Sequence, residues 1–333
     1  MEIRLASTRG FCAGVDRAIE IVKKVIEIHG APVYVKHEVV HNKTVVEELK
    51  RLGAIFVEDI KEIPEGEVVV YSAHGISKAV EIESGVRKLD VFDATCPLVS
   101  KVHAEVNTYA KMGFDCLLIG HKNHPEVEGT MGQFDTSFGG TITLIEDISD
   151  AKKLNFEDSS RLAFVTQTTL SVDDTKDIKE FLIDRFPDIK GPKKDDICYA
   201  TSNRQDAIKQ LALESDLVLV IGSENSSNSN RLREIAERSG VEAYLIDSIE
   251  DLPLDCLKGK SKIGLTSGAS APEHLVAEVI DKLTSSYGFN LVGNKIRTDE
   301  GISFRLPKGL RSVSYTHLRA HETGRNIVCR LLL

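Results

Sequence analysis

The sequence repeats one arrangement three times, and this repeat limits the possible folds more than any other feature. Each copy starts with a cysteine in a polar turn, continues into an amphipathic helix, and then offers two apolar strands that each end in a polar loop. Counted from Cys12, Cys96 and Cys198, the first loop follows after 29, 28 and 28 residues and the second after 62, 72 and 72 residues. These offsets lead to His41, His124 and Ser226, and then to His74, Thr168 and Ser270.

Alternating strands and helices predict an α/β fold in which small parallel sheets are joined by right-handed crossovers. Ligand sites in such sheets gather at the carboxyl ends of the strands, where all six loops are expected. Three similar units around a pseudo-threefold axis would bring three cysteines and six polar loops to one central cavity. We therefore divide the chain into α/β domains at residues 1–95, which carry Cys12, 96–193 and 194–283, followed by a closing segment at 284–311.

The end of the chain does not continue this pattern. From about Ser314 the sequence SYTHLRAHETGRNIVCRLLL has no clear period of 2 or 3.6 residues, and its composition changes abruptly. It resembles translated adapter or vector sequence, so we interpret 312–333 as an artefactual tail and leave His317, His321 and Cys329 out of the site. A genuine short tail is the alternative.

Composition limits the partners and the compartment. The 333 residues carry a formal net charge of −9, which argues against nucleic acid or an anionic membrane as the main partner. No apolar run approaches the roughly 20 residues that span a bilayer, and residues 1–14 lack the apolar core of a secretory signal. We expect a cytoplasmic protein, in which cysteines are thiols, metal ligands or redox groups rather than disulfides.

Three cysteines from three units suit zinc, copper(I) or an iron–sulfur cluster. Structural zinc sites usually use close CxxC pairs, whereas Cys12, Cys96 and Cys198 are 84 and 102 residues apart. A polynuclear cluster bridges such distant positions more naturally. A [4Fe–4S] cluster normally takes four cysteines, so three would leave a fourth iron open to bind a substrate oxygen as a Lewis acid. Cys116 is expected in a buried strand and Cys256 in a connector, and neither is a predicted ligand.

The polar loops supply compact hydrogen-bond donors that suit a diphosphate, and histidine adds positive charge beside an anion. The predicted contacts are His41, His74, His124, Thr168, Ser226, Ser227, Asn228 and Ser270, with Asn42 and Thr169 as possible helpers. The alternative for NSSNSN is a capped loop that merely starts a helix at Arg231. The histidines outside corresponding loops are assigned structural roles: His29, His37, His103, His121 and His274.

The HPEVEG segment offers a proton donor. Glu126 follows His124 by two residues, and a carboxylic acid there could protonate a departing hydroxyl group while Thr168 orients it. The structural alternative is a first-turn helix carboxylate stabilised by the helix dipole. Glu128 competes for the same catalytic role.

Long motifs in this chain resemble the LytB/IspH family of 4-hydroxy-3-methylbut-2-enyl diphosphate reductases of the non-mevalonate isoprenoid pathway. They include RGFCAGVDRAI, HEVVHN, FDATCPLV, HPEVEGT, TQTTLSVDD and NSSNSNRL, and the resemblance covers nearly the whole chain up to about Leu310. It implies a trefoil of three α/β domains around one [4Fe–4S] cluster held by Cys12, Cys96 and Cys198. It also implies diphosphate contacts and a proton donor, Glu126, at the positions given above.

The implied reaction is a two-electron, two-proton reductive dehydroxylation that yields isopentenyl or dimethylallyl diphosphate. No GxGxxG fingerprint follows a strand, so no bound nicotinamide or flavin is expected and an external carrier of the ferredoxin or flavodoxin type would supply electrons. One alternative is a hydro-lyase that uses the cluster without net electron transfer. Another is a non-catalytic diphosphate-binding or zinc-stabilised protein.

Overall fold

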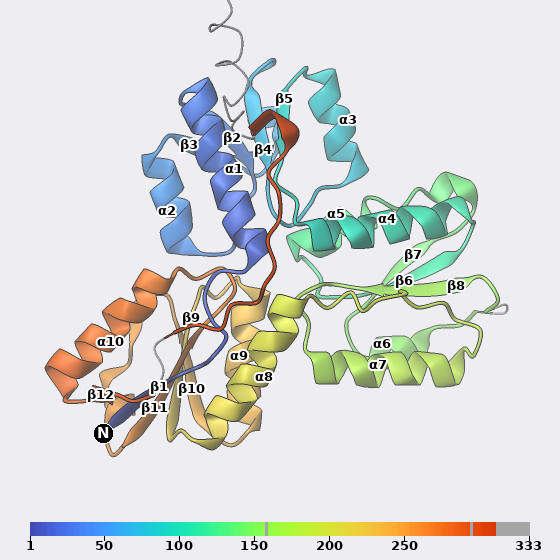
Figure 1. Ribbon diagram of the computed structural model, residues 1–333. Coiled ribbons are helices and arrows are strands. Elements are labelled where there is room, and N and C mark those ends of the chain that lie inside the picture. The colour runs from blue at the N-terminus through green and yellow to red at the C-terminus, as the bar shows by residue number, and fades with distance from the viewer. Residues whose placement is uncertain (157–158, 294–295, 311–333) are drawn as a thin grey trace, which may run out of the picture.

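Short runs of β-branched and aliphatic residues form the strands that carry the site. The computed structural model describes residues 1–156, 159–293 and 296–310, so the tail predicted at 312–333 lies outside the described residues. Val68–Tyr71, Leu217–Ile221 and Leu162–Thr166 are almost entirely buried, as expected for parallel strands covered by helices on both faces. The strands form three separate sheets, one in each of three lobes that meet at the centre of the molecule (Figure 1).

The first lobe contains a four-stranded parallel sheet in the order β3-β2-β4-β5. Its strands are β2 (Val33–Lys36), β3 (Ala54–Val57), β4 (Val68–Tyr71) and β5 (Asp90–Asp93). Its helices are α1 (Ala13–His29), α2 (Lys43–Arg51), η1 (Ile60–Glu62) and α3 (Lys78–Val86). The apolar stripe of α1 packs on this sheet, which is what the sequence period of that helix predicts.

The second lobe contains a three-stranded parallel sheet in the order β7-β6-β8. Its strands are β6 (Asp115–Ile119), β7 (Ile142–Ile145) and β8 (Leu162–Thr166). Its helices are α4 (Pro97–Lys111), α5 (Pro125–Met131), η2 (Thr136–Phe138), α6 (Ile148–Lys153) and α7 (Val172–Arg185). Pro97 stands at the first position of α4, where its missing N–H costs nothing.

The third lobe contains a five-stranded parallel sheet in the order β10-β9-β11-β1-β12. Its strands are β1 (Glu2–Leu5), β9 (Leu217–Ile221), β10 (Glu242–Ile246), β11 (Lys262–Ser267) and β12 (Asn290–Leu291). Its helices are α8 (Tyr199–Leu213), α9 (Ser227–Arg238), η3 (Ile249–Asp251), η4 (Leu254–Leu257) and α10 (Glu273–Tyr287). Strand β1 thus joins the third sheet although it precedes Cys12, and the domain boundaries drawn from the sequence stay a prediction.

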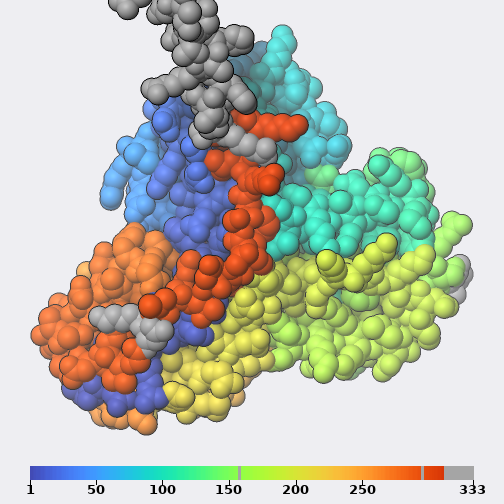
Figure 2. Space-filling view, viewed as in Figure 1, coloured from blue at the N-terminus to red at the C-terminus, as the bar shows by residue number. Residues whose placement is uncertain are grey.

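A strap formed by residues 296–310 crosses the junction of the lobes and ends in η5 (Lys308–Leu310) (Figure 2). It is tied to the third lobe by Glu300, which pairs with the buried Arg204 at 3.2 Å. At the first lobe Arg17 donates a hydrogen bond to the Arg305 carbonyl, and Leu310 enters the apolar core. These contacts hold the lobes together on one face of the molecule.

The α/β class and the small parallel sheets predicted from the sequence are confirmed. The six predicted strands correspond to β2, β4, β6, β8, β9 and β11. In the part of the chain that the structure describes, no helix combines the length and apolar character needed to cross a membrane.

Candidate active site

Each cysteine of the repeat lies directly before a helix. Cys12 is the N-cap residue of α1, Cys96 of α4 and Cys198 of α8, and none of the three side chains caps its own helix. The sulfurs are therefore free to face the centre of the molecule. Three helix N-termini, each with positive partial charge, point toward the same region and favour thiolates or an anionic group there.

A ring of backbone hydrogen bonds positions these cysteines. Each cysteine N–H donates to a carbonyl in the second polar loop of the preceding repeat unit, and for Cys12 the preceding unit is the third one. The three bonds join Cys12 to Ala269 at 3.2 Å, Cys96 to Ala73 at 3.0 Å and Cys198 to Thr168 at 3.0 Å. The ring ties all three lobes together, so the cysteines are placed by the main chain.

The three cysteines line one cavity of about 110 Å³ together with residues of the polar loops. A Cβ atom added to Gly14 would lie 2.8 Å from Cys96 Sγ and 3.8 Å from Cys12 Sγ. Both sulfurs therefore lie within 4 Å of one point that only glycine leaves open. Cys198 Sγ lies 3.1 Å from Thr201 Oγ1, which also lines the cavity.

Burial keeps these thiols protonated when no metal is bound. It raises the pKa of Cys96 to about 12 and that of Cys198 to about 11, with the neighbouring Cys12 adding to both shifts. Burial likewise raises the pKa of Cys12. A metal would displace the thiol protons, and soft thiolates at three helix N-termini fit an iron–sulfur cluster. The donor set thus suits the group expected from the sequence.

Three imidazole rings stand beside the cysteines in the same cavity. The ring centroids of His41 and His74 are 4.1 Å apart in a stacked arrangement, and His124 lies 5.4 Å from His41 and 5.9 Å from His74. Burial, and then the neighbouring imidazoles, lower the pKa of His41 to about 3 and that of His124 to about 4. The same causes lower the pKa of His74. The rings are therefore neutral at pH 7 unless an anion joins them.

The third lobe adds hydroxyl and amide groups at the N-terminus of α9. Ser226 is the N-cap residue, and its Oγ lies 3.5 Å from Ser270 Oγ, which donates to the His41 carbonyl at 2.8 Å. Helix α9 starts at Ser227, four residues before Arg231, so the NSSNSN segment is both a helix start and part of the cavity wall. Both amide atoms of Asn228 are buried without a hydrogen-bond partner. Such unmatched polar atoms in a cavity wall indicate a polar ligand.

Glu126 is the carboxyl group of the cavity. Its Oε1 accepts a hydrogen bond from the Thr168 backbone N–H at 2.6 Å, and its Oε2 accepts one from Thr168 Oγ1 at 2.9 Å. Burial raises its pKa to about 7, against the opposing effect of these hydrogen bonds. The competing Glu128 is exposed and lines a different hollow. Glu126 can therefore hold or release a proton near neutral pH.

The other candidates from the sequence lie elsewhere or play structural parts. Cys116 is buried in β6, and Cys256 is buried in η4. Asn42 caps α2 through its side chain, while Thr169 lines the cavity and accepts a hydrogen bond from Gln167. A larger hollow of about 420 Å³, lined by His121 and Arg231 among others, contains none of the predicted site residues.

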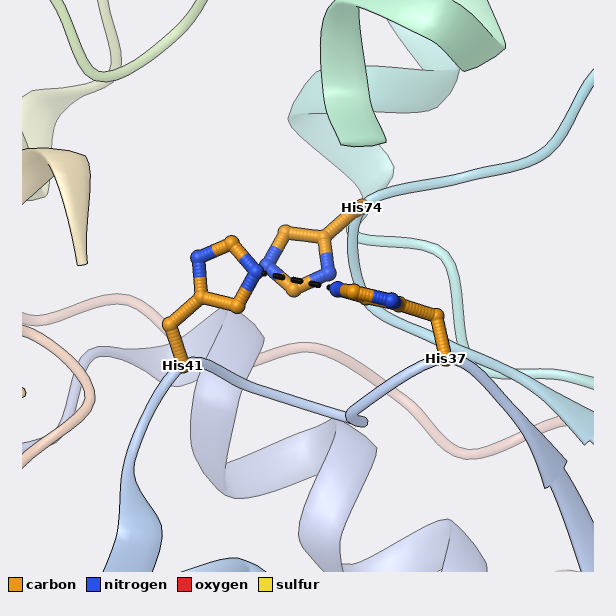
Figure 3. Close-up of side chains that lie close together, drawn as sticks. All are labelled: His37, His41 and His74. Atoms are coloured by element: carbon orange, nitrogen blue, oxygen red, sulfur yellow. Dashed lines mark hydrogen bonds between the residues drawn. The ribbon is translucent and has the colours of Figure 1, made fainter. Parts of the chain in front are cut away.

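His37, to which the sequence analysis assigned a structural role, lies beside the predicted site histidines. In the structure His37 Nε2 lies 3.2 Å from His41 Nε2 at the edge of the imidazole group (Figure 3). The HEVVH pair, with two histidines four residues apart after a strand, was the available signal. The signal was incomplete because only the turn after β2, where His37 has a φ of 62°, brings the two rings together, with their centroids 5.5 Å apart and the ring planes at 82°.

Three parallel sheets around a cavity lined by three thiols, three imidazole rings and one carboxyl group define an α/β protein whose central site is suited to a metal and to an anion. A family model described as "LytB protein" matches residues 3–284. The chain belongs to this LytB family.

Proteins of known name share most of this sequence. A 4-hydroxy-3-methylbut-2-enyl diphosphate reductase of Saccharophagus degradans is 60% identical over 311 residues, which are 93% of this chain and 100% of the relative. The enzyme of the same name from Alcanivorax borkumensis is 59% identical over the same shares of both chains.

Two solved structures share the fold. The E-1-hydroxy-2-methyl-but-2-enyl-4-diphosphate reductase from Plasmodium falciparum is 39% identical, with a TM-score of 0.86 over 92% of this chain and 96% of that chain. A second reductase, described as the terminal enzyme of the non-mevalonate pathway, is 32% identical, with a TM-score of 0.60 over 85% of this chain and 99% of that chain.

Proposed function

We propose that this protein reduces 4-hydroxy-3-methylbut-2-enyl diphosphate to isopentenyl and dimethylallyl diphosphate, the last step of the non-mevalonate pathway. The substrate takes up two electrons and two protons, its C–O bond to the hydroxyl group breaks, and water leaves. The observation that carries the proposal is that one cavity is lined by three thiols, Glu126, an imidazole group and a Ser/Asn loop. The imidazole group is His41, His74 and His124, and the Ser/Asn loop is Ser226, Ser227 and Asn228. The family and the names of its close relatives support the same reaction.

Cys12, Cys96 and Cys198 are proposed to hold one [4Fe–4S] cluster with an open fourth iron. When bound, such a cluster supplies the electrons, and the iron without a cysteine ligand supplies Lewis acidity. The protein's part is to present three thiolates at helix N-termini and to keep Gly14 free of a side chain. The external electron donor of the ferredoxin or flavodoxin type and the cytoplasmic location stay predictions.

The diphosphate is proposed to bind between the imidazole group and the N-terminus of α9. Helix α9 presents free backbone N–H groups there, which favour an anion. Asn228 has amide atoms without a hydrogen-bond partner. His124 Nδ1 accepts a hydrogen bond from the Glu126 N–H at 3.1 Å, so the neutral ring carries its hydrogen on Nε2 and can donate it to an anion. The full set of proposed contacts is His41, His74, His124, Thr168, Ser226, Ser227, Asn228 and Ser270.

Glu126 is proposed to give a proton to the departing hydroxyl group, which then leaves as water. Its pKa of about 7 means that a fraction of the carboxyl groups carries a proton at neutral pH. The two hydrogen bonds from Thr168 fix the orientation of the carboxyl group, so Thr168 belongs to the same proton-delivery pair. The second proton goes to the allylic carbon framework.

The test compares Glu126→Gln with Glu128→Gln in anaerobically purified protein. Glu126→Gln keeps the iron content and the affinity for pyrophosphate but loses turnover by about 10²–10⁴-fold, because the proton donor is gone. Glu128→Gln, at an exposed position in the same helix, keeps wild-type turnover. Full activity of Glu126→Gln would exclude the proposed proton donor.

The same assay separates the proposed reaction from hydro-lyase chemistry. Product must form only with an added reductant, and its amount must follow the electrons consumed at two per product. Turnover without reductant would favour a hydro-lyase. A protein that contains no iron and turns nothing over would favour a non-catalytic diphosphate-binding protein.

A further inference from the structure

The strap of residues 296–310 is fastened to the chain beside the cysteines. In Figure 1 it runs past the N-terminal ends of α1 and α8. Arg297 of the strap donates a hydrogen bond to the Phe11 carbonyl at 3.0 Å, one residue before Cys12. The strap therefore contacts the main chain next to a proposed cluster ligand.

Arg204 of α8 extends this contact to two cysteine segments at once. Its Nη2 donates a hydrogen bond to the Gly10 carbonyl at 2.7 Å, two residues before Cys12. Its Nη1 donates one to the Ala200 carbonyl at 2.8 Å, two residues after Cys198. A single guanidinium group thus connects the chain beside two of the three cysteines.

Glu300 of the strap holds this guanidinium group in place. Both of its carboxylate oxygens lie 3.2 Å from Arg204 Nη1, and Oε2 also lies 3.2 Å from Nη2. Asn203 donates a further hydrogen bond to Glu300 Oε1 at 2.9 Å. The Arg204 side chain is fully buried and the Glu300 side chain is 11% exposed, so salt and water screen the pair only weakly.

Stability alone does not explain a buried ion pair of this kind. Taking both charges out of water costs so much free energy that well-packed apolar residues of similar size often stabilise a fold equally well. Arg204 Nε is also buried without a hydrogen-bond partner. The described wall of the thiol cavity includes neither Arg204 nor Glu300, so contact with a substrate does not explain the pair either. Its distinguishing features are its charge and its place beside two cysteine segments.

The charges of the pair act on Cys12. Burial raises the pKa of the Cys12 thiol, Arg204 opposes this rise, and Glu300 adds to it by a smaller amount. The pair therefore acts on the sulfur as a net positive charge. Reduction of a metal cluster adds one negative charge to its site, and a nearby positive charge favours that state.

We propose that Arg204, oriented by Glu300, is a positioning residue of the three-cysteine site that increases both the retention and the reduction potential of the cluster. The inference rests on the cluster assigned under the proposed function. Arg204 fixes the chain beside Cys12 and Cys198, and its charge favours the reduced form. Glu300 holds the guanidinium group and offsets part of its charge.

Two variants of the anaerobic holoprotein separate the charge of the pair from its geometry. Glu300→Gln keeps the size of the side chain and removes one negative charge. Its reduction potential is expected to be more positive by about 59 mV, which is a tenfold change in the equilibrium constant for one electron. Dithionite supplies the electron in a titration that is followed by electron paramagnetic resonance.

Arg204→Lys keeps the positive charge but has no planar fork that reaches Gly10, Ala200 and Glu300 together. It is expected to lose iron to a chelator about 10–100-fold faster than the wild type, with a smaller change of potential. The potential of Glu300→Gln tests the pair even where Arg204→Lys does not fold.

Glu83→Gln is the matched control. It removes the same charge from a half-buried carboxylate that pairs with Arg87 at 3.9 Å in the first lobe, and it keeps the wild-type potential and iron retention. A wild-type potential in Glu300→Gln, or wild-type iron retention in Arg204→Lys, would overturn the inference, while iron and sulfide in the wild type would still support the proposed cluster. A wild type without iron would exclude the cluster and this role of the pair together.

Discussion

The cysteine ring and the imidazole pocket line one cavity but differ in how they are built. The imidazole pocket consists of the imidazole group and the Ser/Asn loop. The cysteine ring is the set of three cysteines with their ring of backbone hydrogen bonds, and each lobe contributes the same parts to it. The pocket departs from the repeat: the first lobe supplies two histidines, the second supplies His124, and the third supplies serines and Asn228. Main-chain geometry repeats with the fold, whereas side-chain chemistry in equivalent loops has diverged to surround an asymmetric ligand.

The two regions also differ in how they exchange protons when a ligand binds. Burial raises the pKa values of the thiols and lowers those of the imidazoles, so both groups are neutral when nothing is bound. Thiols release protons to a metal, and imidazoles take up protons beside an anion. The difference predicts that changes in the cysteine ring affect the cofactor, while changes in the pocket affect anion affinity.

The largest effect is expected from Cys198→Ser, which removes a proposed ligand from the cysteine ring. Iron and sulfide content fall sharply, and turnover falls more than about 10²-fold because the metal supplies several kcal/mol of catalysis. Elemental analysis and the reductant-dependent assay measure both. Cys256→Ser is the matched control, because Cys256 is buried in η4 away from the cavity. An intact cluster in Cys198→Ser would remove this residue from the ligand set.

The next largest effect is expected from Gly14→Ala, which adds one methyl group to the cysteine ring. The new Cβ would lie 2.8 Å from Cys96 Sγ, so the sulfur must move and the iron content falls. Turnover falls in proportion to the iron that is lost. Helix propensity alone predicts a more stable variant with no loss of iron, because alanine stabilises a helix by about 0.5–1 kcal/mol relative to glycine.

Gly85→Ala is the control for this substitution. A Cβ atom at Gly85 in α3 meets nothing within 4 Å, so the variant keeps its iron and shows an equal or slightly larger free energy of unfolding. Equal iron contents in the two variants would show that the space beside Gly14 is not needed.

The cysteine ring was predictable because its placement depends on regular main-chain features. A cysteine before an amphipathic helix and constant offsets to strand ends are visible in the sequence. Strand β1 shows the limit of this approach, since it pairs with β11 across more than 250 positions of the chain. No local pattern specifies which of three similar sheets a four-residue strand joins.

The pocket was predictable only in part. His41, His74 and His124 were found because they occupy corresponding loops, and Glu126 because it follows one of them. The place of His37 beside His41 could not be predicted, because it depends on a positive φ and on a contact with Glu58, which is 21 residues away in sequence. The choice between Glu126 and Glu128 likewise needed burial, which the sequence around them does not reveal.

A moderate effect is expected from Asn228→Ala in the pocket. Both amide atoms lack a partner, so their removal breaks no hydrogen bond of the free protein and leaves the free energy of unfolding nearly unchanged. Pyrophosphate binds about tenfold more weakly, because a hydrogen bond to a charged group is lost. Calorimetric titration measures the affinity while iron content stays constant.

Asn42→Ala is the opposite case and serves as the control. Its side chain accepts a hydrogen bond from the Val45 N–H and caps α2, so the variant loses about 1 kcal/mol of stability. Its pyrophosphate affinity is retained. If both variants lost stability and kept affinity, Asn228 would belong to the fold rather than to the anion pocket.

The smallest expected effect is a pH dependence of pyrophosphate binding. In the free protein the pKa values of His41 and His124 are about 3 and about 4, so both rings are neutral above pH 6. A bound anion raises these values, and the complex therefore holds more protons than its separate components. By linkage, affinity must weaken as pH rises, by about threefold per pH unit if half a proton is taken up.

Pyrophosphate itself titrates in this range, so the difference between two proteins isolates the contribution of the imidazoles. Titrations in two buffers of different ionisation enthalpy give the number of protons taken up by the wild type and by His41→Asn. The variant is expected to take up fewer protons and to show a shallower pH dependence. Asparagine at position 41 has no ring nitrogen that a bound anion could cause to be protonated, whereas the buried His41 ring is neutral until the anion binds. Equal proton uptake would mean that the rings bind the anion as neutral hydrogen-bond donors, as the Ser/Asn loop does. The contrast in proton exchange between the imidazole pocket and the cysteine ring would then be wrong.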